Sequence, residues 1–180
     1  MIYALLDFDL LSRHNLSIED FILKAKKVDA TILQYRDKNS DIKDIKNRLI
    51  KIRKLWDKTL IINDYIELIE FADGLHIGQE DLEKYGSIEN IRAKIGNKIL
   101  GLSTHNEKEV LEANNMDVDY IGLGAYRPTT TKDVSSIGGK KLLDIAKLSN
   151  KDVAIIGGVR LDDEIPTKYK VIGSGILEVK

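Results

Sequence analysis

The feature that most constrains the fold is a regular alternation of short apolar runs with longer amphipathic segments along the chain. The apolar runs predict eight β-strands, over residues 2–6, 30–36, 59–64, 74–78, 98–104, 120–126, 153–158 and 170–176. The amphipathic segments predict helices over residues 17–28, 41–56, 65–72, 87–96, 106–116 and 139–149. Strands that are apolar at nearly every residue are typical of a parallel sheet covered on both faces.

Two architectures fit this alternation, a doubly wound open sheet and a closed (β/α)8 barrel. Eight strands match the closure number of the barrel, and polar residues follow many successive strands, where a barrel assembles its site. An open sheet gathers such residues at one switch point, and no glycine-rich dinucleotide fingerprint follows the first strand. We therefore predict an α/β fold, a compact (β/α)8 TIM barrel formed by a single domain over residues 1–180.

The last two units of this barrel are short. The segment "RLDDEIPTKY" predicts a truncated seventh helix, and only "LEVK" follows the last strand, which predicts that the eighth helix is missing. Barrel wall would then be uncovered between the last strands and the first. We expect a partner subunit or the N-terminal segment to cover it, which favours a homodimer.

Composition excludes several classes of protein. The 28 basic and 29 acidic residues nearly cancel, so nothing favours a nucleic acid or an anionic membrane as partner. The absence of cysteine excludes disulfides, thiolate metal sites and a cysteine nucleophile. No apolar run approaches the roughly 20 residues of a membrane span, and acidic residues follow the first six positions, too soon for a signal peptide. We expect a cytoplasmic protein.

The second strand ends in Gln34, Arg36 and Lys38, which are spaced by two and so point the same way if the strand stays extended. Arginine binds a phosphate or pyrophosphate through two hydrogen bonds, and lysine adds a point charge. This spacing favours an anion site, and the alternative is a solvated strand edge.

Carboxylates follow the third strand, which ends in Asn63 and Asp64, and the fourth, which ends in Gln79-Glu80-Asp81. Neighbouring strands lie about 4.8 Å apart, so Asp64 and Asp81 could reach one ion. Two carboxylates together with water and substrate phosphates suit Mg²⁺. Alternatively, these residues are helix N-caps.

The fifth strand and the loop after the sixth add hydroxyls and one more cation. Ser103 and Thr104 could donate to a phosphate, while His105 is a general acid or base, or a neighbour in a polar network. The long loop that follows "GLGAY" contains Pro128 and the cluster Thr129-Thr130-Thr131-Lys132, which suits a lid or a ligand loop. Surface exposure alone could also explain its polarity.

The seventh and eighth strands end in "IIGGV" and "IGSGI". In a (β/α)8 barrel the loops after these strands often bind phosphate through glycine amides and a small hydroxyl. Gly157, Gly158 and Ser174 fit that role, although glycine also permits tight turns for packing alone. The sequence thus predicts two anion sites at one mouth.

Several motifs, in order and spacing, resemble the thiamine-phosphate synthase (thiamine-phosphate pyrophosphorylase) family: "QYRDK", "IINDYIELIEFADGLHIGQEDL", "GLSTH", "DYIGLGAYRPTTTK" and "IIGGV". The resemblance implies a (β/α)8 barrel, usually dimeric, and a transferase. Members of the family join hydroxymethylpyrimidine pyrophosphate to thiazole phosphate with Mg²⁺, giving thiamine monophosphate and pyrophosphate. Pyrophosphate leaves first, and the thiazole nitrogen captures the pyrimidinyl-methyl cation.

The resemblance also implies roles for individual residues. The Mg²⁺ ligands would be Asp64 and Asp81. The pyrophosphate would be bound by Arg36, Lys38, Asn63, Ser103 and Lys132, and of these we expect Arg36, Lys38, Ser103 and Lys132 to be catalytic. The pyrimidine would face Gln34, the thiazole would lie near Thr129 and Thr131, and the thiazole phosphate would lie on Gly158 and Ser174.

The sequence departs from the family pattern at Ala125 and Arg127, and the arginine predicts an additional cation in the lid. Two other functions stay open. A thiazole phosphate tautomerase would use His105 for proton transfer, and that related branch generally lacks the acidic and pyrophosphate-binding residues found here. A non-catalytic barrel would only bind a phosphorylated ligand or a partner enzyme.

Overall fold

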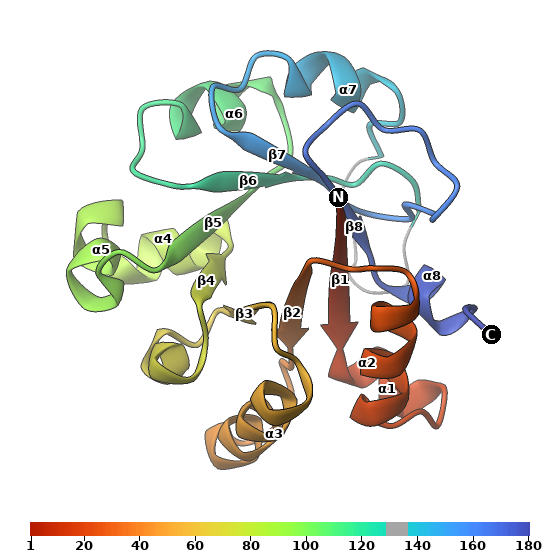
Figure 1. Ribbon diagram of the computed structural model, residues 1–180. Helices are drawn as coiled ribbons and strands as arrows, with labels where there is room; N and C mark the ends of the chain where they lie inside the picture. The colour runs from red at the N-terminus through yellow and green to blue at the C-terminus, as the bar shows by residue number, and fades with distance from the viewer. Residues whose placement is uncertain (129–136) are drawn as a thin grey trace.

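A computed structural model of the protein describes residues 1–128 and 137–180. Its strands are β1 (Ile2–Asp7), β2 (Ile32–Arg36), β3 (Thr59–Asn63), β4 (Gly74–Ile77), β5 (Ile99–Thr104), β6 (Tyr120–Leu123), β7 (Asp152–Ile155) and β8 (Tyr169–Ile172). They are parallel and pair in chain order, and β8 closes on β1 (Figure 1). The predicted (β/α)8 barrel is confirmed.

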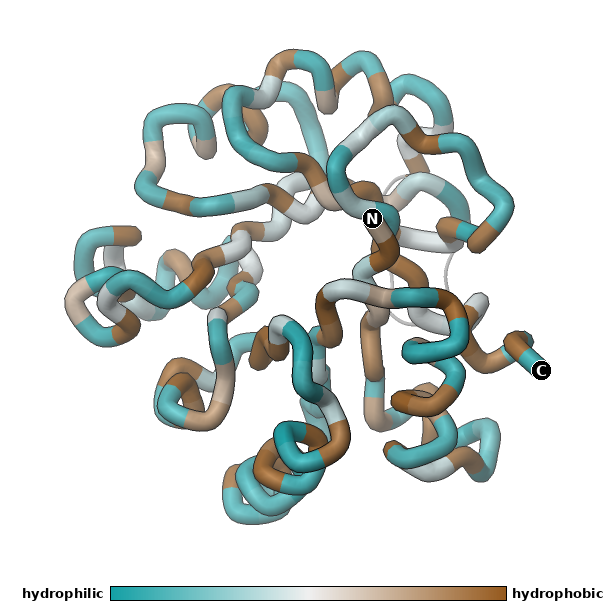
Figure 2. The backbone as a smooth tube through the Cα atoms, in the orientation of Figure 1, coloured by the Kyte–Doolittle hydropathy of each residue, from teal (hydrophilic) through white to brown (hydrophobic). Residues whose placement is uncertain are grey.

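Helices surround the barrel. They are α1 (Phe8–Arg13), α2 (Ile18–Lys27), α3 (Ile42–Leu55), the 3₁₀ helix η1 (Ile66–Phe71), α4 (Gln79–Tyr85), α5 (Ile88–Ile95), α6 (Glu107–Ala113), α7 (Lys141–Ala146) and α8 (Ser174–Leu177). Along the helices apolar and polar segments alternate (Figure 2), and in α3 the apolar face formed by Ile45, Leu49 and Ile52 is fully buried. In the described part of the chain, no helix has the length and apolar character to cross a membrane.

Two short helices that the sequence did not predict begin where strands end. Asp7 closes the start of α1 because its carboxylate accepts a hydrogen bond from the N–H of Leu10 at 2.9 Å. Asp81 does the same for α4, accepting from the N–H of Gly78 at 3.0 Å. Residues 79–81, expected at the end of a strand, therefore form the first turn of α4. Helices this short show no clear apolar period.

The C-terminal units are short but cover the barrel wall. Residues 156–168 contain no helix, so the seventh helix, which was predicted to be truncated, is absent. The expectation that no helix follows the last strand is wrong in detail, since α8 forms one turn and packs on α2. Val159 is buried, and Leu161 and Ile165 pack against the core, so an irregular segment covers wall that we expected to be bare.

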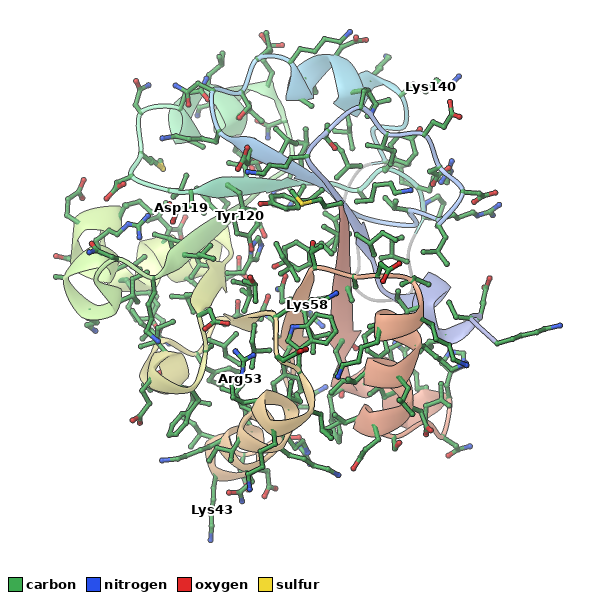
Figure 3. The ribbon with its side chains drawn as sticks, viewed as in Figure 1. Lys43, Arg53, Lys58, Asp119, Tyr120 and Lys140 are labelled. Carbon is green, nitrogen blue, oxygen red and sulfur yellow. The ribbon has the colours of Figure 1, made fainter. Side chains whose placement is uncertain are left out.

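The face of the barrel where the strands begin is held by two matching ion pairs, and Figure 3 labels one member of each, Arg53 and Asp119. Arg53 bonds to Asp73 at 2.8 Å, and the same carboxylate oxygen accepts from the N–H of Leu60 at 2.8 Å. Arg92 bonds to Asp119 at 2.8 Å, and Asp119 accepts from the N–H of Leu100, near the start of β5, at 2.7 Å. Each pair ties a helix to the start of a strand.

Trp56, the single tryptophan of the sequence, lies at this same face. It follows the last residue of α3, is fully buried, and donates its indole N–H to the carbonyl of Thr59 at 2.9 Å. Its side chain is therefore fixed by both packing and a hydrogen bond, on the side of the barrel remote from the strand C-termini.

Candidate functional site

A cavity of about 270 Å³ opens at the C-terminal ends of the strands, and we call it the mouth cavity. Of the residues predicted to bind substrate or metal, its wall contains Gln34, Arg36, Lys38, Asn63, Asp64, Ser103, Gly158 and Ser174. Residues from the second to the eighth strand unit therefore converge, as predicted. The expected sites at Thr129, Thr131 and Lys132 lie outside the described residues.

One side of the mouth cavity is cationic. Arg36 forms an ion pair with Asp7, which is buried at the end of β1. A guanidinium has five N–H donors, so this pair orients Arg36 and still leaves donors for a ligand. The sequence did not single out Asp7, although its position directly after an apolar strand was an available signal. In the folded sheet, the register places Asp7 level with Arg36.

Lys38 lies beside two carboxylates of the neighbouring units. Its Nζ is 2.7 Å from Oδ2 of Asp64 and 3.7 Å from Oε1 of Glu80. Burial lowers the pKa of Lys38, but the hydrogen bond and the charge of Asp64 raise it by more. The pKa of Lys38 is therefore above the ordinary lysine value. Lys38 is therefore a fixed positive charge at the cavity wall.

Asp64 and Asp81 are neighbours, as the adjacent strands predicted. Asp64 has a φ of 67° in the left-handed region, which non-glycine residues seldom adopt. Asp81 lies behind the wall and is 8% exposed. Burial raises the pKa of Asp81 to about 6, and the adjacent charge of Asp64 adds to that rise. A buried carboxylate whose pKa is raised by a second carboxylate beside it is suited to a cation between the two.

This pair fits Mg²⁺ as a partial ligand set. Within residues 1–128 and 137–180, no group of three or more His, Cys, Asp or Glu could hold a metal by itself. Mg²⁺ usually keeps several waters and uses one or two carboxylates together with substrate phosphates. Asp64 and Asp81 could thus hold the ion only when a phosphorylated ligand supplies the remaining oxygens.

Beneath the cationic side, buried amides form hydrogen bonds across the barrel. Gln34 donates its Nε2–H to Oδ1 of Asn63 at 2.6 Å. The hydroxyl of Tyr3 donates to Oε1 of Gln34 at 2.8 Å, and all three side chains are at most 7% exposed. Both polar atoms of the Gln34 side chain are therefore engaged, and its orientation is fixed.

The same set of hydrogen bonds continues to the far wall. The hydroxyls of Tyr3 and Tyr120 are 2.8 Å apart, and that of Tyr120 is 2.9 Å from Nδ1 of His76. His76 Nε2 is 3.0 Å from Oγ of Ser103. Burial raises the pKa of both tyrosines well above the ordinary value, so both keep their protons.

The sequence reading missed Tyr3, His76 and Tyr120 because all three lie within strands rather than at strand ends. A signal was present. His76 is the one polar side chain inside the run "GLHIG". A polar residue in an otherwise apolar barrel strand indicates an inward position with hydrogen-bond partners.

His105, predicted either as an acid or base or as a neighbour in a polar network, lines the mouth cavity. Its Nδ1 is 2.9 Å from Oε2 of Glu109, one helical turn further along. The same carboxylate accepts from the backbone N–H of His105 at 2.9 Å. The ring is therefore oriented by Glu109 at the rim.

Glycines form the side of the cavity opposite Arg36. Gly157 and Gly158 have φ values of 92° and 60°, which favour glycine. A Cβ on Gly158 would lie 2.7 Å from both Cβ of Arg127 and the carbonyl oxygen of Pro128. Here the requirement for glycine comes from backbone conformation and close packing together. Ser174 lies at the start of α8 on the same side.

Arg127 is bound to the protein rather than presented as an additional cation in the lid, so that expectation is wrong. Its guanidinium pairs with Asp163 through two hydrogen bonds of 2.6 and 2.7 Å, and it donates to the carbonyl of Gly158 at 3.1 Å. The hydrogen bonds from Arg127 lower the pKa of Asp163 to about 2. The pair connects the segment after β6 to the segment after β7.

The sequence matches the thiamine monophosphate synthase family over residues 9–173. A thiamine-phosphate synthase of Persephonella marina is 39% identical over 137 residues, covering 72% of this chain and 64% of that protein. Another, of Clostridium beijerinckii, is 36% identical over 168 residues, covering 89% and 78%. The chain thus spans about two thirds to four fifths of these relatives.

Solved structures agree on the fold. A thiamine phosphate pyrophosphorylase from Pyrococcus furiosus superposes with a TM-score of 0.80 at 24% identity, covering 96% of this chain and 85% of that one. A 3-hexulose-6-phosphate synthase superposes with a TM-score of 0.65 at 14% identity, covering 96% of this chain and 89% of that one. At such identities the likeness shows the barrel and no more.

Proposed function

The chain belongs to the thiamine monophosphate synthase family, and we propose that it joins hydroxymethylpyrimidine pyrophosphate to thiazole phosphate, giving thiamine monophosphate and pyrophosphate. The observation that supports this most is the mouth cavity itself. It has Arg36, Lys38 and the Asp64–Asp81 pair on one side and the glycine segment with Ser174 on the other. Two anionic groups can therefore bind at one mouth.

The cationic side would stabilise the leaving group. As the bond between the pyrimidinyl-methyl carbon and the pyrophosphate oxygen breaks, negative charge develops on that oxygen. Lys38, fixed by Asp64, and Arg36, oriented by Asp7, can each donate to it without reorganisation. Mg²⁺ held by Asp64 and Asp81 would supply further charge neutralisation to the same group.

The opposite side would bind the second substrate. Backbone amides near Gly158 and the hydroxyl of Ser174 suit a phosphate monoester. Gln34 would face the pyrimidine, and Asn63 would donate to the pyrophosphate. Ser103 and Lys132 are proposed pyrophosphate contacts, and Thr129 and Thr131 are proposed thiazole contacts, all from the family resemblance.

A product assay tests this function. Purified protein with Mg²⁺ and both phosphorylated substrates should form thiamine monophosphate. Lys38→Gln should lower kcat/KM by 100-fold or more, since a charge-assisted contact in the transition state is lost, on the order of 3 kcal/mol. The matched control is Lys43→Gln, whose side chain points away from the barrel (Figure 3). No product from the wild-type protein would refute the proposal.

A second candidate is a thiazole phosphate tautomerase, which the His105–Glu109 pair at the cavity rim favours. Proton transfer by His105 would then be essential and the pyrophosphate contacts would not. Comparing His105→Ala with Lys38→Gln separates the two, because each variant disables only one of them. A protein that binds pyrophosphate with Mg²⁺ in calorimetry but turns over neither substrate set would be the non-catalytic barrel.

Oligomeric state and location are proposed with the function. The family resemblance favours a homodimer in the cytoplasm, although residues 156–168 and α8 cover much of the wall that first suggested a partner. Analytical ultracentrifugation of the purified chain tests the dimer, and a single species of about 20 kDa would argue against it.

A further inference from the structure

We propose that a set of buried hydrogen bonds from Ser103 to Asn63 has a single direction, in which each residue donates to the next. In this proposal Tyr3, Tyr120 and His76 are positioning residues that determine which atoms face the ligand. The chain of partners is Ser103, His76, Tyr120, Tyr3, Gln34 and Asn63, and we call it the buried chain. Its two ends lie on the β5 and β3 walls of the mouth cavity.

The direction follows from counting hydrogens. Gln34 donates to Asn63 through Nε2, so its Oε1 is the atom that accepts from Tyr3. Tyr3 has one hydroxyl hydrogen, and it is engaged by Gln34. Tyr120 must therefore donate to Tyr3 across the 2.8 Å contact.

The same argument fixes the histidine. The only hydroxyl hydrogen of Tyr120 is used on Tyr3, so at the 2.9 Å contact His76 Nδ1 must carry the hydrogen and donate. In the neutral ring, Nε2 is then an acceptor, and Ser103 donates to it at 3.0 Å. His76 is held as the Nδ1–H tautomer, which is an observable consequence of the direction.

The opposite direction would reverse every bond and place the hydrogen on Nε2. The charges around Asn63 argue against it. In the direction proposed, Oδ1 of Asn63 accepts from Gln34, so its amide N–H groups face the cavity beside Arg36 and Lys38. An anion bound by these cations requires donors there, and the reverse direction would present a carbonyl oxygen instead.

Packing keeps the buried chain in place. A Cβ on Gly101 would lie 2.2 Å from Cζ of Tyr120, so the ring fits only because β5 has a glycine at that position. The rings of Tyr3 and Tyr120 have centroids 5.9 Å apart and both contact Tyr169. The tyrosine hydroxyls therefore cannot turn to other partners without repacking the barrel interior.

The direction gives the cavity a fixed polarity. The β3 wall offers N–H donors, and Ser103 on the β5 wall, with its hydrogen on His76, offers oxygen lone pairs. A ligand that is anionic at one end and has an N–H donor on a heteroaromatic ring at the other fits in one orientation only. If the proposed function holds, the pyrophosphate lies on the β2–β3 side. Ser103 then accepts from the pyrimidine, in place of the pyrophosphate contact that the family resemblance implies for it.

Nitrogen NMR of the histidine rings tests the direction independently of activity. The ¹⁵N-labelled protein is measured well above the ordinary histidine pKa of about 6.5, where neutral tautomers are distinguished by ring shifts. The sequence has three histidines, and His76→Gln assigns the signal. His76 should be the Nδ1–H tautomer, and Tyr120→Phe should shift it toward Nε2–H. An Nε2–H tautomer in the wild-type protein overturns the proposal.

Kinetics test the positioning role. Tyr3→Phe and Tyr120→Phe each remove one hydroxyl and should raise KM for the pyrimidine pyrophosphate about fivefold to tenfold, leaving KM for the thiazole phosphate unchanged. Tyr169→Phe is the matched control, because its ring packs on the same two tyrosines outside the buried chain. Equal KM values for the pyrimidine pyrophosphate in all three variants would contradict the positioning role of Tyr3 and Tyr120. If the wild-type protein forms no product, the proposed function fails while the tautomer still decides the direction.

Discussion

At the scale of single residues, Asp81 shows that a helix cap and a candidate metal ligand need not be alternatives. Its carboxylate accepts from the N–H of Gly78 at 3.0 Å and so closes the start of α4. The same carboxylate lies beside Asp64, whose charge adds to the rise in the pKa of Asp81. A cap fixes the side chain where a second carboxylate is already present, which is the arrangement that a cation would need.

Asp81 should make the metal-free protein less stable as pH rises. Its pKa is about 6 when folded and about 3.9 in an unfolded chain, so the folded state binds the proton more tightly. The contribution of Asp81 to the free energy of unfolding should therefore be greatest below about pH 4. It should fall as the pH rises toward about 6 and stay lower above that pH. Asp81→Asn keeps a cap oxygen and removes the charge. We expect it to raise the free energy of unfolding at pH 7.5 by about 1 kcal/mol.

Urea unfolding at several pH values measures this effect, with Asp162→Asn as the control because Asp162 is exposed. Added Mg²⁺ with pyrophosphate should stabilise the wild-type protein and leave Asp81→Asn unaffected. An identical pH dependence in the wild type and Asp81→Asn would contradict the assignment.

At the scale of elements, the seventh unit shows how a barrel keeps a loop in position without its helix. Arg127 and Asp163 form a bidentate ion pair between the segments that follow β6 and β7. Backbone bonds run alongside, from Tyr126 to Ile156 and from Arg127 to Gly157, both at 2.9 Å. The glycine side of the cavity is thus supported by a side-chain pair in place of a helix.

Weakening this pair should affect the second substrate selectively. Arg127→Ala and Asp163→Asn should each raise KM for thiazole phosphate about tenfold, because the Gly158 segment loses a charge-assisted contact, with little change in KM for the pyrimidine pyrophosphate. Steady-state kinetics with each substrate varied in turn measures this.

The control is Arg160→Ala, since Asp163 accepts from the backbone N–H of Arg160 at 2.7 Å and that bond survives the substitution. The exchanged pair, Arg127→Asp with Asp163→Arg, should recover part of the loss. Equal increases in both KM values would indicate a general loss of structure instead.

At the scale of the whole molecule, the ion pairs that hold the barrel and the residues that form the cavity lie at opposite ends of the strands. Arg92 bonds to Asp119 at 2.8 Å and donates to the carbonyls of Asp117 and Lys98 at 2.9 and 2.8 Å. Arg53 likewise bonds to Asp73 and donates to the carbonyl of Lys58, next to the start of β3. Stability and activity should therefore be separable.

Arg92→Ala should lower the free energy of unfolding by about 2 kcal/mol, since a carboxylate and two carbonyls lose their partner, while kcat and both KM values stay unchanged. Urea unfolding and the product assay measure the two quantities. Lys108→Ala, on an exposed side chain of α6, is the control. A large loss of activity without a loss of stability would show that the two ends are coupled.

The strands and the cavity residues at their ends could be predicted because one alternation of apolar residues determines both. The partners of the polar side chains inside the barrel could not be predicted. His76 meets Asn63 and Tyr120 only through the strand register, and nothing local in "GLHIG" specifies that register. Likewise, Arg127 and Asp163 are 36 residues apart, so their ion pair depends on how two loops pack. The helices α1 and α4 are too short to show a helical period of apolar residues in the sequence.

The position of Trp56 has a practical consequence. Because this single indole is buried and hydrogen-bonded at the face where the strands begin, its fluorescence should change when the barrel unfolds and remain constant when ligands bind at the other end. Its emission is therefore a built-in optical reporter of folding. It allows every substitution above to be checked for an intact barrel in the same sample in which binding or turnover is measured.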